Sequence, residues 1–321
     1  IRMDVKHFQK VIADFEHSGC DYTSDDVIAE FASDNPENFL FPFMEGVIAN
    51  LKTLGKIRTS ETYAATLCSF RRFREDKDVP FDDMDSDMMM AYEAYLKNNG
   101  VSPNSSSFYM RNLRAVYNRA VEKGLTSQRF PFKHVYTGVD KTVKRAVPLK
   151  VIKRIKEMDF SMNPSFDFAR DMFLMSFYTR GMSFVDMAYL RKKDLQNGVL
   201  SYRRRKTGQQ LFIKWEKCMQ EIVNKYDTSQ SNYLLPIIKP FGDIDERKQY
   251  IYAAHNINRC LKIIGKELGL SVSLTLYVAR HAWASIAKSK NVPLSVISEG
   301  MGHDSEATTR IYLASLDTVA I

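Results

Sequence analysis

The sequence predicts a mainly α-helical protein of two domains, with a small β-hairpin in the second domain. Apolar residues recur at intervals of three and four through most of the chain, which is typical of amphipathic helices. Two short runs, 199–203 and 211–215, flank a turn at Lys206-Thr207-Gly208 and indicate a hairpin. With 321 residues, 45% hydrophobic and 26% charged, the chain is long enough for two folded domains.

Four amphipathic helices between residues 41 and 130 predict a compact helical first domain. Each is marked by apolar side chains at helical spacing, and a glycine follows the first, third and fourth. The marking residues are Phe43, Val47, Ile48 and Leu51; Tyr63, Leu67, Phe70 and Phe73; Met88, Ala91, Tyr92 and Tyr95; and Tyr109, Leu113, Val116, Tyr117 and Ala120. Ser102-Pro103 opens the fourth helix with a capping residue and a proline at the first helical position.

The second domain is predicted for residues 148–321, after a basic linker over 131–147. Residues 1–40 are interpreted as a separate acidic segment. Helical patterns of the second domain are expected at 149–158, 165–190, 216–225, 248–268, 276–289 and 293–301. Together with the hairpin they predict a mixed α/β domain.

The net charge of +8 is unevenly distributed along the chain. Residues 1–40 hold 3 Lys and Arg against 9 Asp and Glu, whereas residues 141–220 hold 18 against 7. The basic middle of the chain is expected to face a polyanion such as DNA. A solvated lysine-rich surface is the alternative that charge alone leaves open.

Cysteine usage and hydropathy exclude several other classes of protein. Cys20, Cys68, Cys218 and Cys260 are far apart, so no structural zinc site is expected and a reduced cytoplasmic compartment is favoured. No apolar run approaches the roughly 20 residues that span a membrane. The opening ten residues lack the apolar core of a signal peptide. Because the chain opens without methionine, we expect further residues to precede Ile1.

The residues near the C-terminus that carry chemistry are Arg280, His303 and Tyr312. Breaking a phosphodiester needs a nucleophile, positive charge on the non-bridging oxygens and a proton for the leaving oxygen. An arginine fork suits the phosphate oxygens because it binds them in pairs and stays charged. Tyrosine has an ordinary pKa of about 10, so it needs cationic neighbours to act as a nucleophile. The set therefore predicts phosphoryl transfer.

The segment from Thr275 to Leu316 resembles the active-site region of the tyrosine recombinases, or phage integrase family. That family carries a His-x-x-Arg motif, a Gly-His pair and a nucleophilic tyrosine nine residues after this histidine. Here Tyr277-x-x-Arg280, Gly302-His303 and Tyr312 fill these places, and the frequent Arg-His pair is Arg280-His281. The family also places a catalytic lysine in a β-hairpin, often as Lys-Thr-Gly. The resemblance therefore implies that Lys206 is the general acid, whereas an ordinary basic turn is the alternative.

The sequence departs from the family pattern at two places. Tyr277 stands where a histidine is usual, so a site residue with an altered role is expected. The family's first arginine belongs to a Thr-Gly-Leu-Arg motif, and alignment on Asp186 puts Ser183 at its position. Arg180 lies three residues earlier, about one helical turn, and we expect it to supply this guanidinium; a surface arginine is the alternative. Such a substitution resembles the Bacteroides-type integrase branch.

The resemblance also names supporting and DNA-contacting residues. Asp186 would support the site through hydrogen bonds or cap its helix locally, with Ser183 beside it, and His281 would order the active-site helix. We expect basic residues of both domains and the linker to contact DNA phosphates, although each is also compatible with a solvent-facing role. They are Arg71, Arg72, Arg74, Arg111, Arg114, Lys141, Lys144, Arg145, Arg203, Arg204 and Arg205. The entry Gly55-x-x-Arg58-Thr59-x-x-Thr62-Tyr63 resembles that of the family's helical core-binding (SAM-like) domain.

The resemblance implies site-specific recombination of double-stranded DNA, as integration, excision or inversion, by a bacterial enzyme of a mobile element. Arg180, Arg280 and His303 would hold the scissile phosphate while Tyr312 forms a 3′-phosphotyrosine link, with neither cofactor nor metal. The expected assembly on DNA is a homotetramer. A monomer in the free state and accessory DNA-bending proteins are further options. The implied location is the bacterial cytoplasm, at the nucleoid when the enzyme acts.

Two other functions are compatible with the sequence. A type IB topoisomerase uses the same chemistry, but a separate core-binding domain and the Gly-His pair favour recombination. A catalytically silent DNA-binding regulator on the same scaffold is supported by the departures at Ser183 and Tyr277. The presence of Lys206, Arg280, His303 and Tyr312 favours an enzyme.

Overall fold

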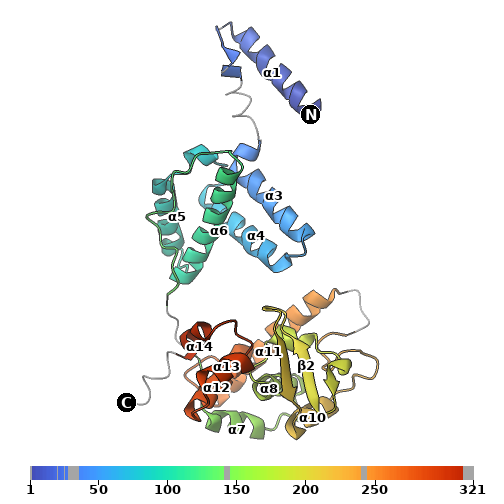
Figure 1. Cartoon of the computed structure of the whole chain (residues 1–321). Coiled ribbons are helices and arrows are strands. Elements are labelled where there is room, and N and C mark those ends of the chain that lie inside the picture. Colours follow the sequence, from blue (N-terminus) through green and yellow to red (C-terminus); the bar gives the residue numbers. More distant parts are fainter. Residues whose placement is uncertain are drawn as a thin grey trace. The chain divides into compact units, whose positions relative to one another are not determined.

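The computed structural model describes residues 2–19, 21–24, 26–27, 36–140, 145–239 and 244–313, with the side chains of 2–8, 311 and 312 excepted. The protein is mainly helical with one small antiparallel sheet, which confirms the predicted fold class (Figure 1). It divides into two compact units, Ile1–Lys141 and Thr142–Ile321. Each unit has its own hydrophobic core. No helix of the described residues is long and apolar enough to cross a membrane.

The first unit contains the four amphipathic helices that the sequence predicts. Its elements are α1 (Arg2–Ser18), η1 (Pro36–Asn38), α3 (Leu40–Thr53), α4 (Ile57–Phe73), η2 (Phe81–Asp83), α5 (Ser86–Asn98) and α6 (Pro103–Glu122). Phe70, Tyr92 and Tyr117 are fully buried in the core, and the rings of Phe70 and Tyr92 meet edge to face at 5.0 Å. Helix α1 lies in the acidic N-terminal segment of residues 1–40.

The second unit is built around a central buried helix. Its elements are α7 (Leu149–Glu157), α8 (Pro164–Tyr178), α9 (Phe184–Ala188), η3 (Lys192–Asp194), β1 (Leu195–Gln196), β2 (Val199–Arg203), β3 (Gln210–Lys214), α10 (Lys217–Asn224), α11 (Glu246–Glu267), α12 (Leu276–Ser289), α13 (Leu294–Gly300) and α14 (Glu306–Leu313). Helix α8 packs against both α11 and α12. Met172, Phe173 and Met175 of α8 are fully buried, so this helix forms the centre of the core.

The single helix expected over 165–190 is interrupted, and this expectation is wrong. Helix α8 ends at Tyr178, and α9 begins at Phe184. Between them Arg180 and Gly181 adopt left-handed backbone angles, with φ of 59° and 72°. A Cβ atom on Gly181 would lie 2.7 Å from the Cα atom of Arg280, so the turn fits against α12 only because residue 181 is glycine.

The hairpin is present, and it joins a third strand. The antiparallel order is β1-β2-β3, with Leu200 paired to Ile213. Residues 204–209 form the loop, in which the Arg204 N–H donates to the Gln209 carbonyl over 2.8 Å. Side chains alternate along β2 and into the loop, so that Leu200, Tyr202 and Arg204 are buried and Arg203 is exposed.

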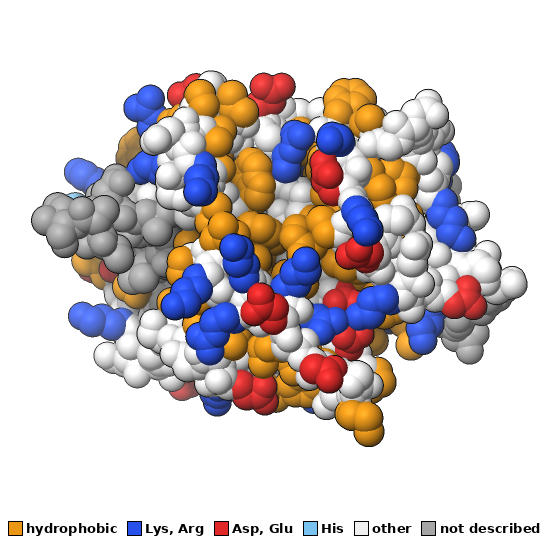
Figure 2. Space-filling model, turned by 90° about the horizontal axis from the view of Figure 1, so that it is seen from below, with side chains coloured by type: hydrophobic (Ala, Val, Ile, Leu, Met, Phe, Trp, Pro, Cys, Tyr) orange, Lys and Arg blue, Asp and Glu red, His pale blue; other side chains and the backbone are white. Residues whose placement is uncertain are grey.

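Basic side chains of the second unit are mixed with acidic ones. Figure 2 shows the side on which α7 and α10 lie, where Lys and Arg side chains alternate with Asp, Glu and hydrophobic patches. The exposed cations of α7 are Lys150, Lys153, Arg154 and Lys156. Some acidic groups are paired, as where Lys217 meets Glu221 over 3.9 Å on α10. Positive charge therefore forms no continuous patch on this face.

Candidate active site

A cavity of about 490 Å³ in the second unit brings together most of the predicted catalytic residues. The hairpin loop contributes Lys206, α12 contributes Tyr277 and Arg280, and the segment after α13 contributes His303. Arg204 and Ser183 also line the cavity. These residues are spread between positions 183 and 303 of the sequence, so only the fold assembles them.

Arg280 is the most firmly held side chain of the site. It is 6% exposed, and its guanidinium donates to the carbonyls of Gly181 and Met301 at 2.6 Å each. An Nη atom also lies 3.0 Å from Nε2 of His303. The turn after α8 and the end of α13 therefore fix the plane of this guanidinium, which suits paired recognition of phosphate oxygens.

His303 is a neutral imidazole of defined tautomer. Arginine can only donate, so Nε2 of His303 accepts from Arg280, and the proton sits on Nδ1. Nδ1 lies 2.8 Å from Oγ1 of Thr309, a fully buried residue of α14, and donates to it. Burial lowers the pKa of His303 to about 4, and the positive charges of Arg280, Arg204 and Lys206 lower it further in the same direction. At neutral pH this imidazole carries no charge.

The hairpin loop presents two cations to the cavity in different ways. Lys206 is exposed at the turn. Arg204 is only 7% exposed, and its Nη1 donates to the carbonyl of Gly302. The sequence predicts Arg204 only as a phosphate contact beside Arg203 and Arg205. Strand alternation could have distinguished Arg204, because it lies two residues after the buried Tyr202 and four after the buried Leu200 and so points to the same side.

Ser183 and Asp186 connect α9 to the hairpin loop. Ser183 caps α9, and its hydroxyl donates to Oδ2 of Asp186 over 2.6 Å. The other carboxylate oxygen, Oδ1, accepts the backbone N–H of Arg205 over 2.9 Å. The buried carboxylate therefore holds the loop that carries Lys206, in addition to its local bond with the cap.

Arg180 does not line the cavity that contains Arg280 and His303, although its side chain is described. Its Cδ atom lies beside Gly300 of α13, 3.6 Å from where a Cβ of that glycine would be. The argument that Arg180 and Ser183 share one helical face is wrong, because the chain between them is a left-handed turn.

Tyr277 and His281 lie on successive turns of α12, and their rings are in contact. The Tyr277 side chain is 60% exposed at the edge of the cavity, whereas His281 is buried. Their rings meet edge to face with centroids 4.6 Å apart. Residue 277 can therefore reach a bound substrate, and residue 281 packs within the unit.

The backbone of Tyr312 belongs to α14, three residues after Thr309, but its side chain is outside the described part of the structure. Lys141 and Lys144 are outside the described residues as well. Arg145 is exposed. Arg203 donates to the Gly208 carbonyl over 2.9 Å, and Arg205 lies over the ring of Tyr189 at 3.9 Å.

The predicted phosphate contacts of the first unit lie on α4, at its C-cap and on α6, and they differ in their hydrogen bonds and ion pairs. Arg71 pairs with Glu45 over 2.7 Å, and Arg72 donates to the sulfur of Cys68 over 3.4 Å. Arg74 and Arg111 are half-buried. Arg114 is exposed and donates to Thr137 over 3.2 Å.

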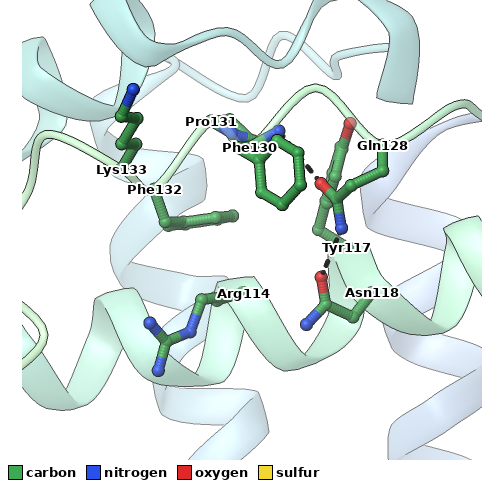
Figure 3. Close-up of a pocket in the computed structure, with 8 residues that line it drawn as sticks. All are labelled: Arg114, Tyr117, Asn118, Gln128, Phe130, Pro131, Phe132 and Lys133. Carbon is green, nitrogen blue, oxygen red and sulfur yellow. Dashed lines mark hydrogen bonds between the residues drawn. The ribbon is translucent and has the colours of Figure 1, made fainter.

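A second cavity, of about 530 Å³, lies between α6 and the loop that follows it. Figure 3 shows the aromatic rings of Phe130 and Phe132 above the helix and Arg114 on the helix beneath them. Gln128 accepts from the backbone N–H of Phe130 and donates to Asn118, which shapes one wall. This cavity holds no group of the phosphoryl-transfer set.

Comparison with known proteins gives consistent results for both units. Residues 39–135 match the phage integrase SAM-like domain, and residues 149–318 match the phage integrase family. A search of curated proteins finds no match.

Solved structures of similar fold include three integrase complexes. A lambda integrase dimer bound to a COC′ core site is 16% identical with a TM-score of 0.67, the match covering 87% of this chain and 96% of that one. A lambda integrase tetramer bound to a Holliday junction is 17% identical, with 94% and 84% coverage and a TM-score of 0.66. The Tn1549 transposon integrase in complex with a circular intermediate DNA is 16% identical, with 86% and 97% coverage and a TM-score of 0.62. At these identities the likeness establishes the fold.

Proposed function

This chain belongs to the phage integrase family, and from that premise we propose that Tyr312 cleaves DNA by bonding covalently to a backbone phosphate held by Arg280. Site-specific DNA recombination by a tyrosine recombinase is the function of the protein. The observation that carries the assignment of the site is the arrangement of Arg280, His303 and Lys206 around one cavity. Tyr312 follows His303 by nine residues on the helix that His303 contacts through Thr309.

The proposed reaction follows from the charges and protonation states of these side chains. The Tyr312 oxygen attacks phosphorus, and the bond from phosphorus to the 5′-oxygen breaks. Arg280 stabilises the charge that develops on the non-bridging oxygens. The neutral His303 accepts the phenol proton at Nε2 once the substrate phosphate has taken over the Arg280 donor. Lys206 gives a proton to the leaving 5′-oxygen. Attack by a 5′-hydroxyl of the partner duplex then reverses these steps and rejoins the strands.

We infer the finer features of this recombinase from the same resemblance. Ser183 at the place of the family's first arginine supports the Bacteroides-type branch. The lambda integrase neighbours, bound to DNA as a dimer and a tetramer, support action as a tetramer on duplex recombination sites. Accessory DNA-bending proteins and a place at the bacterial nucleoid remain part of the proposal. A role in a mobile element is consistent with the transposon integrase neighbour.

We also propose distinct tasks for the segments of the chain. Residues 41–130 would be the core-binding domain, and 148–321 the catalytic domain, with 131–147 as a basic linker; the matched ranges 39–135 and 149–318 support this division. The acidic residues 1–40 would not contact DNA directly. The arginines of α4 and α6 would contact phosphates.

Covalent trapping tests the proposal. The protein would be incubated with nicked duplexes tiled across the DNA that flanks its gene, and adducts would be separated on denaturing gels. We expect a DNA-linked band with the wild type and none with Tyr312→Phe. Tyr277→Phe is the matched control, because it removes a second phenol hydroxyl at the same cavity. An adduct that survives Tyr312→Phe but disappears with Tyr277→Phe would assign the nucleophile to Tyr277 instead.

A further inference from the structure

We propose that Arg204, and not Arg180, supplies the second guanidinium that binds the scissile phosphate. This inference rests on the proposed function, since it concerns the same cavity and the same reaction. It replaces the expectation that Arg180 supplies this guanidinium. It also gives the hairpin loop two roles, because Arg204 would stabilise charge and Lys206 would act as the general acid. Four features of Arg204 support it: its direction on the strand, its contacts, its neighbours and its charge.

The direction of Arg204 follows from strand alternation. Leu200 and Tyr202 of β2 are buried, and Arg204 continues the same face into the loop. Arg203 and Arg205 point to the other side, where both are exposed. Three consecutive arginines therefore have two different environments, and only the middle one lines the cavity with Arg280 and His303.

Arg204 and Arg280 are held by one short turn. Arg280 donates to the carbonyl of Met301, and Arg204 donates to the carbonyl of the next residue, Gly302. Gly302 has a φ of 65°, and a Cβ atom there would lie 3.0 Å from the Cδ atom of Arg204. The glycine of the Gly-His pair therefore leaves room for this arginine. The same turn leads directly into His303, so both guanidinium groups flank the imidazole.

The guanidinium of Arg204 is incompletely paired. Arg204 is 7% exposed, and its buried Nε atom has no hydrogen-bond partner among the residues that the structure describes. Burying a donor of a charged group without a partner is unfavourable, because the group has lost its water and gained nothing in return. Two like charges at one cavity add to this cost. A phosphate diester bound between Arg204 and Arg280 would relieve both penalties.

The electrostatics of His303 agree with this placement. The cations that depress the pKa of this imidazole are Arg280, Arg204 and Lys206. Arg180 does not line the cavity, and its Cδ atom lies beside Gly300 of α13, although its charge acts on the buried Tyr202 as those of Arg280 and Arg204 do. Its left-handed backbone and the neighbouring Gly181 fix the turn that receives the Arg280 guanidinium. Arg180 is therefore part of a structural turn.

A paired-substrate experiment tests the assignment. Single-turnover cleavage would be measured with nicked duplexes that carry either the normal scissile phosphate or a methylphosphonate, in which one non-bridging oxygen is a neutral methyl group. On the normal phosphate we expect Arg204→Ala to slow cleavage by about 10²–10³-fold, the loss typical of removing one charge-stabilising donor. On the methylphosphonate the same variant should cleave within a few-fold of the wild type, because less charge needs to be stabilised. Arg180→Ala tests the alternative, and Lys214→Ala, which removes an exposed cation of β3 outside the predicted phosphate contacts, is the matched control; both should stay within a few-fold on both substrates.

Several outcomes would overturn the assignment. Equal losses on both substrates would mean that Arg204 acts only through the shape of the loop. A large loss in Arg180→Ala alone, restored on the methylphosphonate, would return the role to Arg180.

If Arg204→Ala does not fold, as judged by thermal unfolding, Arg204→Lys and Arg204→Gln replace it. On the normal phosphate the lysine variant should cleave faster than the glutamine variant. Equal rates for these two would contradict a role of positive charge. A failure of the proposed function itself is distinguishable, because the wild type would then form no adduct through Tyr312.

Discussion

The imidazole of His303 makes the stability of the protein depend on pH. Its pKa is lowered from 6.5 to about 4 in the folded state, mainly because it is buried. Between these two values the unfolded chain binds a proton that the folded chain does not. The free energy of unfolding should therefore fall as the pH drops from 6.5 toward 4, by at most about 1.4 kcal/mol per pH unit for this one group. Above pH 6.5 the contribution of this group is constant.

Denaturant unfolding of the wild type and His303→Gln, measured from pH 4.5 to about 7.5, checks this expectation. The difference in unfolding free energy between the two proteins should shrink on acidification, because the glutamine does not titrate. His134→Gln is the control, since His134 is exposed in the first unit. A difference between wild type and His303→Gln that stays constant across the range would show that His303 titrates normally in the folded protein.

At the scale of single residues, the sequence predicts the site wherever spacing along the chain carries the information. Arg280 and His303 stand in recognisable motifs, and both line the cavity. The sequence predicts the same DNA-contacting role for Arg203, Arg204 and Arg205, because residue type does not distinguish them. The alternation of side chains along β2 does distinguish them. The bond from His303 to Thr309 depends on how α14 folds back, so no local pattern predicts it.

At the scale of elements, the turn between α8 and α9 controls the position of Arg280. We expect Gly181→Ala to destabilise the second unit by more than the roughly 1–2 kcal/mol that a left-handed backbone costs an ordinary residue. The added Cβ would lie 2.7 Å from the Cα atom of Arg280, and backbone cannot move aside as a flexible side chain can. Cleavage should also fall, because Arg280 and the Gly181 carbonyl would shift together.

Gly269→Ala separates these two effects. Gly269 has a φ of 67° in the same unit, but a Cβ atom there would meet nothing within 4 Å. Thermal and denaturant unfolding of both variants, together with single-turnover cleavage, gives the comparison. Similar losses of stability in the two variants, with normal cleavage by Gly181→Ala, would mean that the approach of this turn to Arg280 is not tight in solution.

The sequence predicts elements well where apolar periodicity is long and interrupted by clear stops. Helices α3 to α6 are examples, because glycines or a Ser-Pro pair mark their ends. The sequence does not predict the break before α9, because apolar residues continue on both sides of Arg180-Gly181 and only Gly181 indicates a break. Helix α14 was not expected either; it is short, and only Thr309 and Leu313 are buried among its described side chains.

At the scale of the whole molecule, charge rather than any single contact governs the first encounter with DNA. The chain carries a net charge of +8, and in residues 141–220 Lys and Arg outnumber Asp and Glu by eleven. Acidic neighbours compensate part of this charge, as with Glu45 beside Arg71 and the mixed face in Figure 2. Exposed cations outside such pairs therefore contribute most to neutralising phosphates.

The dependence of DNA binding on salt measures that contribution. A protein that neutralises about six phosphates loses about 10³-fold in affinity for non-specific duplex between about 50 and about 200 mM salt. We expect a loss of this order, measured by fluorescence anisotropy with random-sequence duplex. Arg72→Gln, at an exposed position of the predicted contact set, should lower the slope of log affinity against log salt by about 0.9, because one phosphate contact is lost. Lys77→Gln removes an exposed cation that lies 3.7 Å from Glu75, outside that set, and should leave the slope unchanged. Equal slopes for all three proteins would show that α4 does not contact the backbone, and the core-binding surface would then have to be sought on α6.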